Sequence, residues 1–185
     1  VAKGLSGASI SIKLSKDSNL ISNQNTIIGN TVLYGATSGK LFASGKAGER
    51  FAVRNSGANT VVEGCDSNGC EYMTGGNVVI LGQVGDNFAA GMTGGMAFIY
   101  DEKNEFEKKV NSETVIWQRI ETEYWKNLLK NLVQQHVEET KSKIAEKIIL
   151  NFESEINNFY QVCPKEMLNK LQKPISVKNK INIAI

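Results

Sequence analysis

The stretch from Gly29 to Gly95 decides the fold of this chain, and its centre reads AGERFAVRNSGA over residues 47–58. Short apolar runs alternate with glycines along its whole length. Four of these runs can be aligned on single residues, namely Leu41, Val61, Val79 and Ala97. They recur about every nineteen residues. A fixed interval of this size is typical of a solenoid, in which each coil of the chain pairs only with its neighbours.

The interval predicts a parallel β-helix, in which each coil adds one strand and equivalent side chains stack into ladders. We expect the interior ladders to contain Leu41, Phe51, Val53, Val61, Val79 and Ala97. The corners need residues that tolerate positive φ or a close approach to the coil below, and glycine does both. The glycines expected at corners are Gly29, Gly35, Gly48, Gly57, Gly64, Gly69, Gly76, Gly82 and Gly95.

Short segments of alternating or apolar character are expected to be the strands. They cover residues 9–14, 31–34, 41–43, 50–54, 60–63, 71–73, 77–81, 87–90 and 96–100. In Arg50–Arg54, Phe51 and Val53 would point inward and both arginines outward. Val78–Leu81 has no polar face, so we expect other protein, such as helices from the end of the chain, to cover one side of the solenoid.

Two other folds fit parts of the pattern. Asn68-Gly69 is a common hairpin turn and suggests an antiparallel sandwich or barrel, but one turn does not explain the interval. A left-handed hexapeptide helix needs a six-residue aliphatic period, which is absent. The parallel β-helix is therefore the fold that the sequence favours.

The character of the sequence changes near residue 100. All 17 glycines lie at or before Gly95, and both prolines lie after residue 160. We therefore divide the chain into a glycine-rich β-helix over residues 1–100 and an α-helical segment over residues 101–185. A solvated connector at 101–111 would join them. The second segment is expected to pack on the β-helix or to extend from it.

Apolar side chains after residue 111 have helical spacing. A first helix is expected to start from a cap at Asn111 or Ser112 and to present Trp117, Ile120, Tyr124, Leu128, Leu132 and His136. A second would start from Ser142 and present Ile144, Ile148, Phe152, Ile156 and Phe159. His136 is expected to be a partly buried structural side chain, and Pro164 to begin a short helix. The tail at 178–185 is expected to become ordered only on a partner.

Composition and charge argue against several classes of partner and location. The chain has 21 basic and 19 acidic side chains, a net charge of +2, which gives no reason to expect nucleic acid or a membrane surface as a partner. Its longest apolar runs fall far short of the ~20 residues that a membrane-spanning helix needs. Three cysteines without a leader or a glycosylation sequon argue against a secreted disulfide framework. We expect an intracellular protein, and Val1 in place of an initiator Met predicts a piece of a longer polypeptide.

Nucleotide-binding and nucleophile motifs do not occur in the sequence. No Gly-x-Gly is present to open a dinucleotide loop, and the glycines before Lys40 and Lys46 do not have phosphate-loop spacing. Ser6 lacks the second glycine of a nucleophile elbow, and the sole histidine, His136, belongs to the other half of the chain.

The remaining candidates are expected to be structural. Cys65 and Cys70 lack further zinc ligands nearby, and with Cys163 they are expected to be packed thiols. Four carboxylates in the glycine-rich half are expected to point outward and to pair with Arg50 or Arg54. They are Glu49, Glu63, Asp66 and Glu71. We therefore expect no catalytic, cofactor-binding or metal-binding residue in this chain.

Several motifs resemble the C-terminal domain of the large subunit of glutamate synthase. They are KGLSG (3–7), IGNT (28–31), LYGAT (33–37), AGERFAVRNSGA (47–58), GCEYMTGG (69–76) and AGMTGG (90–95). The resemblance covers residues 3–100 almost without gaps. It extends more weakly through His136, Thr140 and Ser142, and it departs at Ala8 and Lys141, where the family tends to have Gly, and at Asn68, where it tends to have His.

The resemblance implies a right-handed β-helix that is a non-catalytic structural domain. The parent enzyme would make two glutamates from glutamine and 2-oxoglutarate by reductive transfer of the amide nitrogen. FMN, an iron–sulfur cluster and the amidotransferase nucleophile are implied for the parent, outside this chain. The implied partners are the amidotransferase and synthase domains, whose relative position this domain would fix, in the cytoplasm or a plastid-like organelle. The isolated chain is expected to be inactive.

A second hypothesis is a stand-alone interaction or assembly subunit. The same β-helix occurs in a subunit of formylmethanofuran dehydrogenase, so the fold alone does not identify the enzyme. The segment after residue 100, with His136, Thr140 and Ser142, resembles glutamate synthase and favours the first hypothesis. Neither hypothesis predicts the oligomeric state, or which electron donor a parent glutamate synthase would use.

Overall fold

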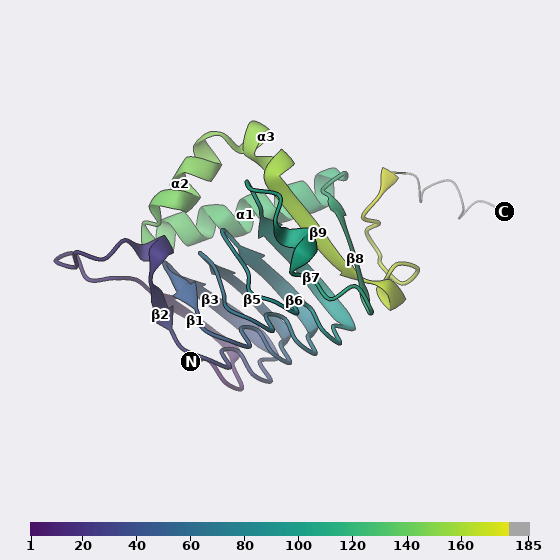
Figure 1. Cartoon of the computed structure of the whole chain (residues 1–185), viewed down its shortest axis with the longest axis horizontal. Helices are drawn as coiled ribbons and strands as arrows, with labels where there is room; N and C mark the ends of the chain where they lie inside the picture. Colours follow the sequence, from purple (N-terminus) through teal and green to yellow (C-terminus); the bar gives the residue numbers. More distant parts are fainter. Residues whose placement is uncertain (178–185) are drawn as a thin grey trace.

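The computed structural model describes residues 1–177 and has a seven-stranded sheet at its centre, in the order β1-β3-β5-β6-β7-β9-β8 (Figure 1). The first five strands pair in parallel. They are β1 (Ser6–Ile12), β3 (Ser38–Ala43), β5 (Ser56–Val62), β6 (Thr74–Ile80) and β7 (Gly94–Tyr100). After each strand the chain loops back and begins the next one alongside. The predicted class, a mostly β solenoid of stacked parallel strands followed by helices, is confirmed, and hairpin pairing does not build these five strands.

Four segments expected to be strands are runs of turns. Residues 31–34, 50–54, 71–73 and 87–90 belong to no strand. In each run, residues with positive φ alternate with residues of negative φ. The positive values include 58°, 58° and 52° at Arg50, Ala52 and Arg54. The same alternation occurs at Thr31, Leu33 and Gly35, at Asn68, Cys70 and Tyr72, and at Asn87, Ala89 and Gly91. We call the segments 31–35, 50–54, 68–72 and 87–91 the turn tiers.

Backbone hydrogen bonds join the turn tiers to one another. The amide of Ala52 donates to the carbonyl of Val32 at 3.0 Å, in the preceding tier, whereas the amide of Arg54 donates to the carbonyl of Glu71 at 2.9 Å, in the following one. Alternate amides thus point in opposite directions, so the tiers stack much as strands do. Phe51, between two outward arginines, is fully buried. Ala52, next to Phe51 in the chain, packs in the same interior cluster. Side chains in the tiers therefore do not alternate between two faces as they do in a strand, which is why the strand prediction was wrong here.

The strands carry two neighbouring rows of stacked side chains. Phe42, Val61, Val79 and Phe98 pair in register and belong to the cluster under the helices. Leu41, Thr60, Val78 and Ala97 pair in the adjacent row, and its apolar members belong to the solenoid interior. The sequence alignment placed Leu41 and Ala97 in one row with Val61 and Val79. In the structure, Leu41 and Ala97 are in register with Thr60 and Val78, one residue earlier in each strand. Val61 and Val79 therefore pack under the helices and not in the predicted interior ladder. In β6 both rows are occupied by valine, Val78 and Val79, so the sequence does not show which of the two faces the interior.

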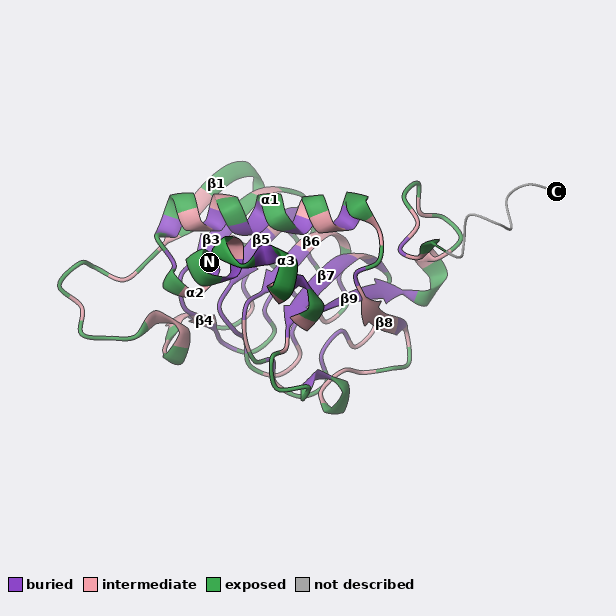
Figure 2. Cartoon of the chain, turned by 90° about the horizontal axis from the view of Figure 1, so that it is seen from above, coloured by how far each residue is buried: buried purple, intermediate pink, exposed green. Residues whose placement is uncertain are grey.

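Helices cover one face of the sheet, as Figure 2 shows from above. They are α1 (Glu123–Thr140), α2 (Lys143–Leu150) and α3 (Phe152–Glu155). Leu129 and Val133 of α1 belong to the same buried cluster as Val79 and Leu81. The expectation that helices from the end of the chain cover the apolar strand at 78–81 is therefore confirmed. No helix within residues 1–177 is both long and apolar enough to cross a membrane.

The segment after residue 100 also contributes strands. β9 (Phe159–Pro164) pairs antiparallel with β7, and β8 (Val115–Arg119) pairs antiparallel with β9. Trp117 and Phe159 lie in these strands, so their assignment to helices was wrong, and α1 begins after Thr122 rather than at Ser112. Val115–Arg119 is rich in β-branched and aromatic residues, and pairing with β9 overrides the helical spacing of its apolar side chains. Ser142 caps α2 as predicted, accepting a hydrogen bond from the amide of Ala145 at 3.2 Å.

Short elements complete the fold. A two-stranded parallel sheet joins β2 (Thr26–Ile28) to β4 (Lys46–Ala47). Single 3-10 turns occur at η1 (Ser22–Gln24), η2 (Phe106–Lys108), η3 (Ile156–Asn158) and η4 (Lys165–Met167). The last of these follows Pro164, where the sequence predicted a short helix. The tail at 178–185 lies outside the described residues.

Candidate functional site

A group of polar side chains is sealed between the solenoid and the helices. It consists of Ser44 after β3, Glu63 after β5, His136 of α1 and Ser142 at the start of α2, and we call it the polar joint. These side chains belong to residues that are at most 5% exposed. The polar joint is therefore a buried polar connection between two layers that otherwise meet through apolar packing.

Glu63 Oε1 is the centre of the polar joint. The hydroxyl of Ser44 donates to it at 3.0 Å and the hydroxyl of Ser142 at 2.5 Å. The Ser142 oxygen also accepts the hydrogen bond that caps α2. One hydroxyl therefore begins the helix and fastens it to the solenoid.

The strand alternation explains why Glu63 faces the helices. Side chains two residues apart in a strand point to the same face, and Val61, two residues earlier, packs in the cluster under the helices. Phe42 and Ser44 are related in the same way. Glu63 thus points away from the solenoid interior as predicted. The expectation that it would pair with Arg50 or Arg54 was wrong, because the helical layer covers this face, leaves Glu63 only 1% exposed and gives it Ser44 and Ser142 as partners.

The environment of Glu63 favours its ionised form. Burial by itself opposes ionisation and would raise the pKa of Glu63. The approach of His136 and the hydroxyls of Ser142, Ser22 and Ser44 act in the opposite direction and outweigh burial. The pKa of Glu63 is therefore lowered from its ordinary value of 4.5, and a carboxylate is present inside the protein at neutral pH.

His136 faces this carboxylate without touching it. Its Nε2 lies 4.0 Å from Glu63 Oε1, which is an ion-pair distance but too long for a hydrogen bond. The ring is fully buried, more so than the sequence suggested, and its centre is 6.0 Å from that of Phe42. The two ring nitrogens and Glu63 Oε2 have no hydrogen-bond partner within residues 1–177.

The polar joint does not have the arrangement of a catalytic triad. In a triad, histidine stands between the nucleophilic hydroxyl and the carboxylate. Here the hydroxyl of Ser142 donates directly to Glu63. Ser142 and His136 are also at most 1% exposed, so a substrate could not reach them in this conformation. The geometry suits a structural connection.

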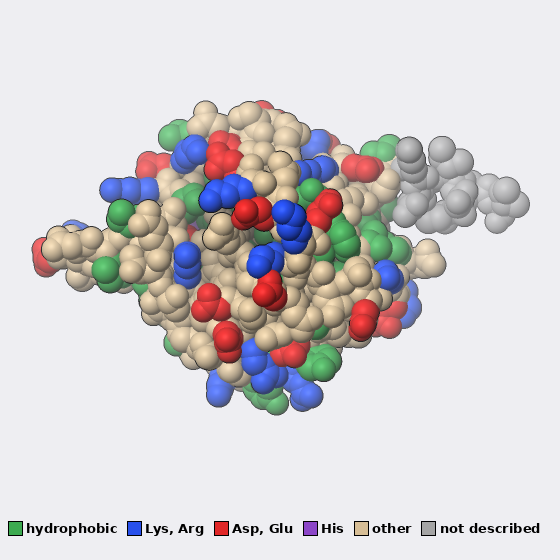
Figure 3. Space-filling model, in the orientation of Figure 1, with side chains coloured by type: hydrophobic (Ala, Val, Ile, Leu, Met, Phe, Trp, Pro, Cys, Tyr) green, Lys and Arg blue, Asp and Glu red, His purple; other side chains and the backbone are tan. Residues whose placement is uncertain are grey.

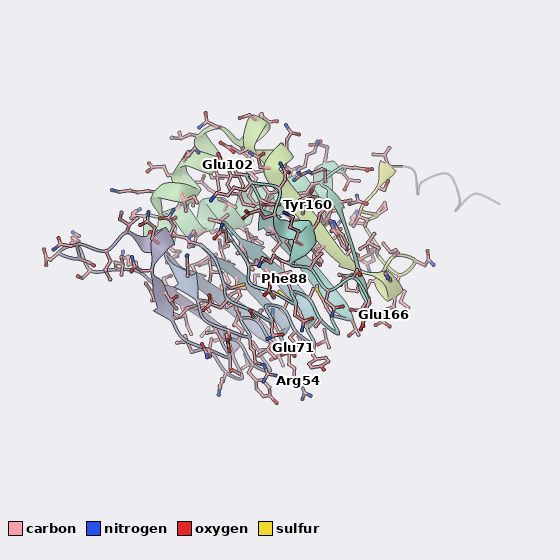
Figure 4. All side chains as sticks on the ribbon, in the orientation of Figure 1. Arg54, Glu71, Phe88, Glu102, Tyr160 and Glu166 are labelled. Atoms are coloured by element: carbon pink, nitrogen blue, oxygen red, sulfur yellow. The ribbon has the colours of Figure 1, made fainter. Side chains whose placement is uncertain are left out.

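A cavity of about 620 Å³ opens beside the polar joint. Its wall includes Glu63, Lys46 of β4, Ile144 of α2 and the connector residues Glu102 and Lys103. Figure 3 shows basic and acidic side chains interspersed over this face of the molecule, and Figure 4 labels Glu102 close to the helices. Since the cavity wall carries both signs of charge, electrostatics does not favour one class of ligand there.

The cysteines are buried thiols with little nucleophilic character. Cys65, Cys70 and Cys163 are free and buried. Desolvation raises the pKa of all three, and that of Cys163 reaches about 11. A thiol that stays protonated is a poor nucleophile and a poor metal ligand. No group of three His, Cys, Asp or Glu side chains within the described part of the chain is placed to hold a metal ion.

The other carboxylates predicted to be outward are less buried than Glu63. Glu71 pairs with Arg50 Nε at 2.8 Å, as expected. Glu49 and Asp66 are exposed. In Figure 4, Arg54 and Glu71 lie at the edge of the solenoid away from the helices. These residues lie in or next to the turn tiers and do not converge on a site.

The glycines expected at corners fall into three groups. Four have positive φ: Gly35, Gly64, Gly76 and Gly95. Four others are so crowded that an added Cβ would collide with a neighbour: Gly48, Gly57, Gly69 and Gly82. Gly29 shows neither property. Gly57, Gly76 and Gly95 lie inside strands, near the starts of β5, β6 and β7. At Gly57 the obstacle is the carbonyl of Thr37 in the coil below, which leaves no room for a side chain.

Sequence reasoning missed several buried polar residues, among them Ser44 and Asn55. Asn55 is fully buried; its side-chain oxygen accepts from the amide of Ala58 at 3.0 Å, and its side-chain nitrogen donates to the carbonyl of the same residue at 2.9 Å. It thereby satisfies the backbone where β5 begins. Its position directly before Ser56-Gly57, a sequence typical of turns, was the signal available. Ser44 had no such signal, because its partners come from distant parts of the chain.

Comparison with known proteins places the chain in a family. The family model described as GXGXG motif matches residues 1–165. The glutamate synthase (NADPH) large chain of Azospirillum brasilense is 59% identical over 182 residues, which is 98% of this chain and 12% of that protein. The corresponding large chain of Bacillus subtilis is 48% identical over 166 residues, 89% of this chain and 11% of that protein.

A third relative comes from a plant. The chloroplastic ferredoxin-dependent glutamate synthase of Spinacia oleracea is 48% identical over 164 residues, 89% of this chain and 10% of that protein. The chain thus spans about a tenth of the length of these curated relatives. The resemblance seen in the glycine-rich half is confirmed and continues through the helical layer to β9. The chain belongs to the GXGXG motif family, as a domain like those of glutamate synthase large chains.

Proposed function

We propose that this chain is a non-catalytic structural domain of a glutamate synthase. The observation that supports the proposal is the extent of the likeness, since nearly the whole chain matches one tenth of each relative of that name. The parent enzyme would transfer the amide nitrogen of glutamine reductively to 2-oxoglutarate and release two glutamates. It would act inside the cell, in the cytoplasm or a plastid-like organelle.

The role of the domain would be to hold the amidotransferase and synthase domains of the parent at a fixed separation. A stack of strands joined by continuous backbone hydrogen bonds and a densely packed core deforms little. The helical layer adds to this stiffness, because α1 packs along the sheet and the polar joint fastens α2. A stiff body of this kind suits a spacing element between two reaction centres.

The parent's cofactors would be held elsewhere. An iron–sulfur cluster generally needs four thiolates, whereas this chain has three cysteines, all buried with raised pKa values. Phosphate groups such as that of FMN commonly bind where a glycine-rich loop opens a helix, and every glycine precedes the helical layer by more than twenty residues. The described residues therefore do not fit either group, and the proposal assigns FMN and the cluster to other parts of the parent chain.

The proposal is tested in the complete large chain by separating the coupled reaction from its two halves. Glutamine hydrolysis, ammonia-dependent glutamate formation and glutamine-dependent glutamate formation would be measured for the wild type and for Val79→Asp. We expect the coupled reaction to fall about tenfold or more relative to the two partial reactions, because misplaced domains lose their mutual orientation. Equal losses in all three would contradict a positioning role.

A complementary measurement uses the 185-residue chain alone. It should show neither flavin absorbance nor glutaminase activity after purification. Either signal would contradict the assignment of the chemistry to other domains.

A further inference from the structure

The polar joint contains three buried atoms that lack a hydrogen-bond partner within residues 1–177. They are Glu63 Oε2, His136 Nδ1 and His136 Nε2. Buried polar atoms in folded proteins nearly always have a partner, either in the protein or in ordered water. Three exceptions on two facing side chains therefore require a physical explanation.

Small movements of the side chains do not satisfy all three atoms. Glu63 Oε1 already accepts from Ser44 and Ser142, and His136 Nε2 is 4.0 Å away from it. The hydroxyl of Ser22 also lies near the carboxylate, but it makes no hydrogen bond to Oε2 and faces neither ring nitrogen as a partner. Moving the ring into direct contact with the carboxylate would satisfy one ring nitrogen and leave the other without a partner. A neutral imidazole also needs a donor for its bare nitrogen, and an ionised carboxylate cannot donate.

We propose that the polar joint is a buried water-binding site, in which at least one water molecule lies between the His136 ring and Glu63 Oε2. Water both donates and accepts, so it can donate to the carboxylate while bonding to either kind of ring nitrogen. One water can reach Glu63 Oε2 and only one of the two ring nitrogens, because these nitrogens point in different directions from the ring. The other ring nitrogen needs a second water, and the remaining hydrogen bonds of each water go to neighbouring waters or polar groups. The inference does not depend on the proposed function of the parent enzyme.

The neighbouring cavity provides a source for this water. Glu63 forms part of its wall, and the cavity volume of about 620 Å³ is far larger than the ~30 Å³ that one water occupies. Glu63 therefore stands between a solvent-accessible space and His136. The other charged group of the solenoid on this wall near Glu63 is Lys46, and α2 contributes the apolar Ile144.

The histidine itself allows a direct test without any substitution. His136 is the only histidine among the 185 residues, so the nitrogen-15 spectrum of the imidazole region contains a single ring. We expect a cross-peak between the ring protons and a long-lived water, and a ring N–H that exchanges slowly with solvent. A ring without any water contact, together with a high-resolution crystal structure lacking density beside it, would overturn the proposal.

A substitution distinguishes a wet site from a dry one by the sign of its effect. His136→Phe removes both ring nitrogens and keeps a ring of similar shape. If water bridges the site, the change leaves Glu63 Oε2 poorly satisfied and should lower Tm by about 3–6 °C. If the site is dry, the change removes two unpaired polar atoms, and Tm should stay the same or rise.

Two further variants keep this test specific. His136→Gln retains groups that can bond to water and should recover part of the lost Tm. In a Glu63→Gln background, His136→Phe should have a smaller effect than in the wild type, because residues that share a water are energetically coupled. Additive effects of the two substitutions on Tm would contradict a shared site. If His136→Phe does not fold, the nitrogen-15 spectrum of the wild type tests whether water contacts the ring.

Discussion

The two long sides of the solenoid are held together in different ways. On the strand side, Phe42, Val79 and Phe98 are almost fully buried beneath the helices. On the turn side, Arg54 and Tyr72 are exposed, and the backbone adopts alternating signs of φ. Both sides bury apolar side chains in the solenoid interior and join through backbone hydrogen bonds. The strand side is also covered by helices, whereas the turn side keeps an exposed outer surface and a backbone of alternating φ.

The difference shows where the fold is stabilised and where it is strained. Ten non-glycine residues of the turn tiers have positive φ. At about 1 kcal/mol each, they cost roughly as much as the whole net stability of a typical domain. The buried rings of Phe51 and Phe88 and the hydrogen bonds between tiers must offset this cost. The strand side carries no comparable strain and should be the less tolerant of polar substitutions.

The largest expected effect comes from a charge on the strand side. Val79→Asp would bury a carboxylate without a partner in the cluster under α1. We expect a loss of at least about 4 kcal/mol in the free energy of unfolding, enough to abolish a cooperative transition. Urea denaturation followed by circular dichroism would measure it.

The matched control is Ser9→Asp on the exposed edge strand β1. It should change the free energy of unfolding by less than about 0.5 kcal/mol. If both variants unfolded at the same urea concentration, the strand side would not be the packed side of the solenoid.

An intermediate effect is expected at the polar joint. The pKa of Glu63 is lowered in the folded protein. Its carboxylate therefore contributes stability that is present above the ordinary value of 4.5 and is lost as the pH falls through the lower folded value. Glu63→Gln should cost about 2 kcal/mol at pH 7, and the Tm difference from wild type should shrink below pH 4.5.

Glu49→Gln is the control for this pH dependence, because Glu49 is an exposed carboxylate of the same half of the chain. Its Tm should follow that of the wild type from pH 7 to pH 3. A gap between the wild type and Glu63→Gln that stays constant over this range would show that the ionised form of Glu63 is not what stabilises the joint.

A smaller effect, of opposite sign on the two sides, tests the turn tiers. Arg54 has φ of 52° and is exposed. Arg54→Gly should relieve strain and stabilise the protein by about 0.5 kcal/mol. Ser9→Gly, in a strand, should destabilise it by a similar amount. Destabilisation by both substitutions would mean that positive φ is not a source of strain in the tiers.

The smallest effect is expected from the ion pair between Arg50 and Glu71. The Arg50 side chain is 47% exposed, so solvent screens the pair. Glu71→Gln should reduce the free energy of unfolding by less than about 0.5 kcal/mol, and added salt should shrink the difference. A larger, salt-independent loss would show that the Glu71 side chain stabilises the tiers by something other than a screened ion pair.

Local patterns predicted several features correctly. The interval of glycines and apolar runs indicated stacked parallel strands, and the apolar character of Val78–Leu81 indicated a covered face. Ser142 was identified as a helix cap from its position before an amphipathic run. These features depend on residues close together in the chain or on a repeated interval, so they can be recognised from the sequence alone.

Long-range contacts produced the errors. Trp117 and Phe159 have helical spacing from their neighbours, but β8 and β9 pair with each other across more than forty residues. Glu63 was expected to pair with Arg50 or Arg54 because α1 and α2, which cover it, come more than fifty residues later in the chain. Spacing within a segment contains no information about which distant segment will lie against it.

The sequence by itself determined the stacking of coils, because a nineteen-residue interval with glycines at points of close approach admits few other folds. It also determined which family the chain belongs to. Only the tertiary structure decided which short apolar segments are strands and which are turn tiers. Both kinds of segment are apolar and closed by glycine or polar residues, and they differ in the sign of φ, which the sequence does not show. It also decided that Glu63 and His136 face each other, because their burial depends on a helical layer docking onto the sheet.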